Sequence, residues 1–168
     1  MPDVIFQDGS IQRDDWTVVP RPAEGESLKI PEQGKALIPA DLWLAGYEHF
    51  AGNYSVGVWF DSHDEPEILE GKVNELPVIA VNFPKFSDGR GYSIARLLRE
   101  RFGYENELRA IGDVLLDQLQ FMKRCGFSAY ALRPDKDIKK AVRCLNFFSQ
   151  GYQAATDTDV PLFRRRAS

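Results

Sequence analysis

The segment from residue 83 to residue 93 (FPKFSDGRGYS) holds the side chains best suited to chemistry. Lys85 supplies a point charge and Arg90 a planar fork of donors, and both kinds of group bind oxyanions in proteins. Ser93 adds a hydroxyl at the start of an expected helix, where backbone N–H groups favour an anion. A phosphate, sulfate, sulfite or carboxylate group would suit this set. The alternative is a structural turn in which Asp88 caps the helix and pairs with the cations.

Charged residues also follow the other expected strands. Asp113 and Arg133 each come directly after an apolar segment. The carboxyl ends of parallel strands meet at one edge of a sheet, and ligands bind there in α/β folds. We therefore expect Arg133 to join Lys85 and Arg90 as a third ligand-binding cation.

The aspartates at this edge have two possible uses. Asp88 and Asp113 would orient the cations or, in an enzyme, act as general acid and base. Asp113 precedes an apolar-periodic segment and Asp135 follows a proline, so both also suit the N-cap of a helix. Neither use excludes the other, because a capping carboxylate can still face a ligand.

No motif indicates a metal or a cofactor. Cys125 and Cys144 are too few to bind an iron–sulfur cluster or to complete a zinc site. His49 and His63 have no ligand-like spacing to other residues. The P-loop, dinucleotide-binding, zinc-peptidase and nucleophile-elbow patterns are all missing from the sequence. The sequence therefore predicts no metal site and no cofactor.

Four short apolar segments, each followed by a segment of helical periodicity, predict the framework that positions these residues. We expect strands at residues 55–60, 78–83, 108–111 and 128–132. Their nearly continuous apolar character is typical of strands that are buried on both faces. This alternation predicts an α/β fold of four βα units with a parallel sheet, either an open sheet or a partial TIM-like barrel.

The N-terminal part differs in composition from the rest. Residues 4–6 and 11–19 favour two strands of a hairpin around Asp8-Gly9, a pair that adopts tight turns readily. The prolines and glycines of residues 20–34 predict an extended connector. We divide the chain into a hairpin and connector (1–39), an α/β domain (40–151) and a C-terminal tail (152–168).

Interleaved charges in the middle of the chain predict a solvated helix surface. The arginines involved are Arg96, Arg99, Arg101 and Arg109. Glutamates alternate with them, so we expect salt bridges at the surface and no binding patch.

Composition limits the classes of partner. The chain has 168 residues and a formal net charge of −4, which gives no drive toward nucleic acid or an anionic membrane. It has no apolar run long enough to span a bilayer and no signal-peptide core. We expect a cytoplasmic protein.

Three pieces of the chain are distinctive: FPKFSDGRGYS, ELRAIGD and DQLQFMKRCGF. They resemble a bacterial family, the domain of unknown function numbered nine hundred thirty-four, and the resemblance extends from the hairpin to FFSQGYQAA at residues 147–155. Members of that family are described as oxidoreductases or accessory proteins of assimilatory sulfite reduction. The resemblance implies a cytoplasmic protein that acts near sulfur assimilation, with sulfite reductase as a partner. The chain has no redox motif, so we expect the electron transfer to belong to that partner.

The residues leave three functions open. The first is an accessory protein of sulfite reduction that binds a small oxyanion. The second is an enzyme whose active site lies at the strand carboxyl ends of a partial barrel. The third is an interaction protein that forms a homodimer or docks on sulfite reductase through a sheet edge, the hairpin and the tail. We expect a homo-oligomer, because a partial barrel leaves edges that need a partner.

Overall fold

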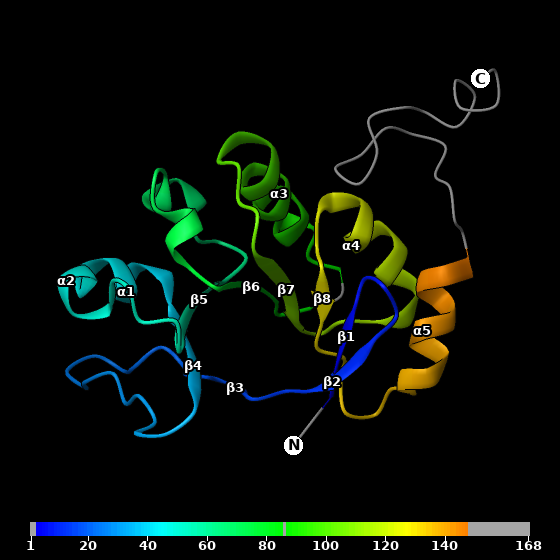
Figure 1. Cartoon of the computed structure of the whole chain (residues 1–168), viewed down its shortest axis with the longest axis horizontal. Helices are drawn as coiled ribbons and strands as arrows, with labels where there is room; N and C mark the ends of the chain where they lie inside the picture. The colour runs from blue at the N-terminus through cyan, green and yellow to red at the C-terminus, as the bar shows by residue number, and fades with distance from the viewer. Residues whose placement is uncertain (1–2, 86, 148–168) are drawn as a thin grey trace.

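A computed structural model describes residues 3–85 and 87–147 and has an α/β fold (Figure 1). One curled sheet of eight strands has the order β2-β1-β8-β7-β6-β5-β4-β3. All neighbours from β3 to β8 are parallel, and β1 is antiparallel to both β8 and β2. The strands are β1 (Asp3–Phe6), β2 (Ile11–Arg13), β3 (Trp16–Val18), β4 (Lys35–Pro39), β5 (Val56–Phe60), β6 (Val78–Phe83), β7 (Glu107–Gly112) and β8 (Ala129–Tyr130).

The helices pack together on one face of this sheet. They are α1 (Ala40–Ala45), α2 (Tyr47–Phe50), α3 (Arg90–Arg96), α4 (Leu119–Cys125) and α5 (Ile138–Phe147). A π-helical turn, Leu97–Arg101, continues α3. The larger hydrophobic cluster joins buried residues of α1, α3, α4 and α5 to one side of the strands. The predicted α/β class is therefore confirmed.

The prediction of four βα units is wrong in two respects. Six strands are parallel, because β3 and β4 precede the four that the sequence predicts. The strand β4 lies between prolines in the region that we expected to be a connector, yet Ala36–Pro39 are buried. In addition, β5 and β6 are joined by two 3₁₀ turns, Pro66–Leu69 and Val73–Glu75, where a helix was expected. Gly71 between them has a φ of +82°, which an α-helix does not accommodate.

The N-terminal hairpin is confirmed, but its second strand is shorter than predicted. Strands β1 and β2 pair around a turn in which the Asp8 carboxylate accepts a hydrogen bond from the Ser10 N–H at 2.9 Å. Residues 16–18 do not belong to this hairpin, because β3 pairs with β4 at the opposite edge of the sheet. Figure 1 shows this N-terminal segment crossing from one edge to the other.

The sheet face away from the helices has its own small core. It consists of Leu37, Trp59, Val78, Ala80 and Ile111, with Trp16 and Ala131 packed against it. Burial on both faces explains why the strands have continuous apolar sequences. The Trp59 indole N–H donates to the Val19 carbonyl at 2.9 Å, which fixes the N-terminal segment over this face.

Two of the arginines that we expected on a solvated helix surface are instead bound to other parts of the chain, and one of them is buried. Arg109 lies on β7 and is 3% exposed. Its Nη1 donates to Asp14 at 2.7 Å and its Nε to Glu107 at 2.7 Å. Arg99 donates to the backbone carbonyls of Gly126, Tyr104 and Asn106 at 2.8–2.9 Å. Both side chains serve long-range contacts that charge alternation along the sequence does not reveal.

Candidate functional site at the carboxyl edge of the sheet

Loops from four neighbouring parallel strands meet at one edge of the sheet, as the sequence predicts. They follow β5 at Asp61, β6 at Pro84, β7 at Asp113 and β8 at Ala131. The antiparallel strand β1 brings Asp3 to the same edge beyond β8. Most of the candidate site residues lie on these loops.

The first cluster consists of Asp88, on the loop between β6 and α3, and Arg90, the first residue of α3. The Arg90 Nε and Nη2 donate to the two Asp88 oxygens at 3.0 and 2.8 Å, and the Arg90 backbone N–H adds a third bond at 3.1 Å. The Ser62 side chain, which is buried at the exit of β5, also hydrogen-bonds to Asp88. Asp61 accepts from the Asn82 amide at 3.2 Å and contributes to the field around Arg90. Two adjacent strand exits thus hold one arginine.

These contacts change the acidity of both partners. Hydrogen bonds from Arg90 keep the pKa of the Asp88 carboxyl far below its ordinary range, and Asp88 raises the pKa of Arg90. Asp88 is therefore a carboxylate at every physiological pH. The pair behaves as one oriented group with a fixed guanidinium plane.

We expect a carboxyl carbon NMR titration to show Asp88 ionised well below pH 3.9, the ordinary value for an aspartate. Its protonated form appears only as the pH falls through the depressed pKa, so the pair stays charged from neutral pH down into the acid range. Substituting Arg90→Ala should return the midpoint toward the ordinary value. A wild-type midpoint near 3.9 would contradict the geometry.

The second cluster lies at the exits of β7 and β8. The Arg133 Nη1 donates to Asp113 at 2.9 Å and its Nε lies 3.2 Å from Asp135. Lys136 lies 3.6 Å from the other oxygen of Asp135. The Asp113 backbone N–H donates to the Phe83 carbonyl at 2.7 Å, which anchors this loop to β6.

The predicted N-cap roles of Asp113 and Asp135 are wrong. The turn after Asp113 starts at Leu116, with Leu115 at its N-cap position. Helix α5 is capped by Asp137, whose Oδ1 accepts from the N–H groups of Lys139 and Lys140 at 2.9 and 3.3 Å. Asp113 and Asp135 are used to hold Arg133 instead.

Two other predicted ligand residues lie outside both clusters. Lys85 is exposed on the β6–α3 loop and has no ion pair within residues 3–85 and 87–147. Ser93 is exposed on α3. Both are exposed, and neither side chain has a hydrogen bond or ion pair to the residues that the structure describes.

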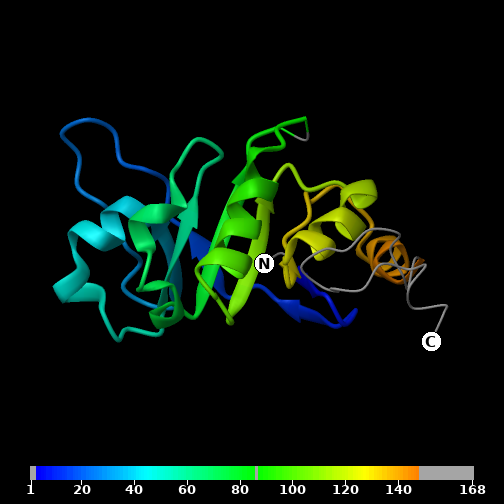
Figure 2. The same ribbon diagram turned by 90° about the horizontal axis from the view of Figure 1, so that it is seen from above.

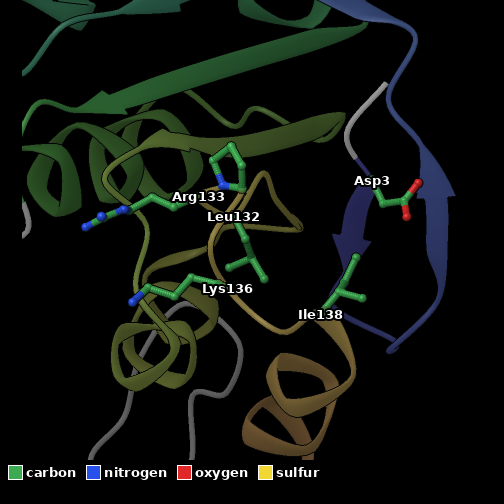
Figure 3. Close-up of a pocket in the computed structure, with 6 residues that line it drawn as sticks. Asp3, Leu132, Arg133, Lys136 and Ile138 are labelled. Atoms are coloured by element: carbon green, nitrogen blue, oxygen red, sulfur yellow. The ribbon is translucent and has the colours of Figure 1, made fainter.

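An open hollow of about 430 Å³ lies beside the second cluster (Figure 3). Its lining residues are Asp3, Leu132, Arg133, Pro134, Lys136 and Ile138. Figure 3 shows Arg133 and Lys136 extending in the same direction, away from Asp3. Lys85 and Arg90 do not line this hollow. Arg90 and Arg133 therefore belong to two separate clusters at the same edge, and Lys85 belongs to neither.

A third group at this edge is not indicated by any pattern in the sequence. A hollow of about 280 Å³ near the exits of β4 and β5 is lined in part by Asp41, His63 and Asp64. Arg21 from the connector reaches into this group, with its Nη1 2.7 Å from both Asp41 oxygens and its Nη2 3.3 Å from Asp64. Its guanidinium also lies 5.9 Å from the centre of the Trp59 ring. No local signal marks Arg21, because its partners lie 20 and 43 residues away.

The described residues contain neither a group of metal ligands nor a membrane-spanning helix. Among residues 3–85 and 87–147, no three His, Cys, Asp or Glu side chains are placed to hold a metal ion. None of the helices in this part of the chain has the length and apolar character needed to cross a membrane.

Comparison with known proteins gives one match. No curated protein and no solved structure matches the chain. Residues 57–163, well over half of the chain, match a family described as "Bacterial protein of unknown function (DUF934)". The matched range covers the strands from β5 to β8 and the loops that carry both arginine clusters. The chain belongs to the DUF934 family of bacterial proteins.

Proposed function

We propose that the protein is a cytoplasmic accessory protein of assimilatory sulfite reduction that binds a small oxyanion on its β6–α3 loop. The link to sulfite reduction rests on the resemblance described above, since the family description itself states no function. In this proposal the chain binds and positions the oxyanion, and sulfite reductase transfers the electrons.

The observation that carries the proposal is the state of Lys85 and Arg90. Asp88 occupies the Nε and Nη2 of Arg90, which leaves Nη1 without a hydrogen bond among the described residues. Lys85, on the same loop, has no ion pair there either. A guanidinium oriented by Asp88 at the start of α3 and an ammonium on the preceding loop can bind the oxygens of a doubly charged anion from two sides.

The same geometry disfavours Asp88 as a general acid. A carboxyl group whose pKa is kept far below its ordinary range has no proton to donate at neutral pH. Asp113 is likewise bound to Arg133. We therefore favour a binding function for this edge over acid–base catalysis.

Isothermal titration calorimetry with sulfite, sulfate and phosphate tests the proposal. We expect heat with at least one of these anions, and a dissociation constant raised about tenfold by Lys85→Ala and by Arg90→Ala, since each removes one charge-assisted contact. Arg133→Ala is the matched control, because it removes an arginine of the second cluster and should leave the affinity unchanged. Absence of heat with all three anions, or an equal loss in the control, would refute the β6–α3 loop as the site.

A second experiment tests the partner. Immobilised protein should retain sulfite reductase from the same bacterium, and the retained amount should be compared with and without bound oxyanion. If the purified enzyme is retained neither with nor without the oxyanion, the docking part of the proposal is refuted. The oxyanion-binding part is tested separately by calorimetry.

A further inference from the structure

The charges of this chain are strongly segregated along the sequence. Residues 40–76, here called the acidic end, carry eight carboxylates against a single lysine, Lys72. Residues 119–147, called the basic end, carry seven lysines and arginines against two carboxylates, Asp135 and Asp137. The modest net charge of −4 for the whole chain hides this contrast.

The fold places the two ends at opposite extremes of the molecule. Helices α1 and α2 of the acidic end and helix α5 of the basic end lie at opposite ends of the longest axis (Figure 1). The view turned by 90° shows the same separation, with the sheet between them (Figure 2). The segregation in sequence is therefore a segregation in space.

Many of these charges are unpaired within the described part of the chain. On α5, Lys139, Lys140 and Arg143 are exposed and form no ion pair with the described residues. Ala141 and Leu145 on the other side of α5 are buried in the main core, so the cationic side of the helix faces solvent.

The acidic end has a matching set. Glu48, Glu67 and Glu70 are exposed, and they too have no ion pair in residues 3–85 and 87–147. Each end thus presents several exposed charges of one sign that have no ion-pair partner among the described residues.

We propose that the basic end of one copy of this chain binds the acidic end of a second copy. Charge complementarity supports a second copy of the chain as the partner, because each molecule carries both surfaces and the two surfaces are opposite in sign. A contact between two different surfaces is heterologous, so it leaves one free end of each sign and continues into a ring or a linear chain. Exposed pairs contribute little individually, so the association is weak and is screened by salt. The inference is independent of oxyanion binding at the β6–α3 loop.

Light scattering and sedimentation equilibrium at two salt concentrations test the association. At about 20 mM NaCl, where screening is weak, the weight-average mass should exceed that of the monomer and rise with protein concentration. At about 0.5 M NaCl it should return to the monomer value. A monomer at low salt, or an oligomer whose mass does not change with salt, would overturn the proposal.

Charge-reversed variants then identify the surfaces. Lys139→Glu with Lys140→Glu, and separately Glu67→Lys with Glu70→Lys, should each abolish self-association at low salt. An equimolar mixture of the two double variants should associate again at low salt, because the intact acidic end of one fits the intact basic end of the other.

Arg13→Glu with Lys29→Glu is the matched control. It changes the net charge as the α5 variant does, but at exposed positions outside both ends, and it should still associate. Circular dichroism confirms that all variants are folded. Failure of the mixture to associate, or loss of association in the control, would show that net charge alone governs the effect and would refute a specific contact.

Discussion

Replacing Arg109 with methionine should lower the free energy of unfolding by about 3–5 kcal/mol, because it breaks a buried ion-pair set on one side only. The Arg109 side chain is 4% exposed, and those of Asp14 and Glu107 are 12% and 21% exposed. Without the guanidinium, two largely buried carboxylates keep their desolvation cost and lose their counter-charge. Urea denaturation at pH 7 measures the loss.

Two further variants separate this effect from loss of packing. Combining Arg109→Met with Asp14→Asn and Glu107→Gln removes all three charges and should recover a large part of the stability. Arg101→Met, at an exposed arginine, should change the free energy of unfolding by less than about 0.5 kcal/mol. A triple variant no more stable than Arg109→Met would show that the guanidinium contributes through shape and not through charge.

Replacing Gly112 with alanine should cost about 3 kcal/mol or more, because two penalties combine at one position. Gly112 ends β7 with a φ of +89°, a region that L-residues enter only with strain. A Cβ atom there would lie 2.5 Å from the Phe83 carbonyl oxygen and would also overlap the Asn82 side-chain oxygen. The Phe83 carbonyl accepts the hydrogen bond that anchors Asp113, so relief of the overlap would disturb the candidate site as well.

Gly71 provides the control for Gly112. Its φ is +82° and no described atom would lie within 4 Å of a Cβ at this position, so Gly71→Ala carries the backbone penalty without the overlap. We expect a loss of about 1–2 kcal/mol for this control in thermal or urea unfolding. Equal losses for the two alanine variants would show that the contact with Phe83 is relieved at no cost.

The elements with strong local patterns could be predicted from the sequence. Strand β6 has the predicted bounds, residues 78–83, because its apolar run belongs to the element itself. Strands β3 and β4 were not recognised as members of the sheet, because each is short and lies near prolines, and because pairing between them is a long-range property.

The sequence predicts the edge of the sheet at which the candidate site lies, but it does not predict the contacts within the site. Parallel neighbours place Asp61, Asp88, Asp113 and Arg133 at one edge, and this follows from the alternation of strands and helices. Which carboxylate meets which arginine depends on loop geometry, so the sequence leaves open whether Asp113 orients a cation or caps a helix. Arg21 shows the same limit, since its partners lie on distant segments. The C-terminal tail proposed for residues 152–168 lies outside the described residues.

The position of the N-terminal hairpin has a consequence for biosynthesis. Strand β1 pairs with β8, so Ile5 must find Tyr130 on a chain that is made from the N-terminus. Strand β1 therefore gains a neighbour on that side only after the chain as far as β8 has been synthesised. Long-range pairing of this kind slows folding and leaves strand edges open in the meantime. Nascent chains of this protein should accordingly depend on chaperones that shield unpaired strands during translation.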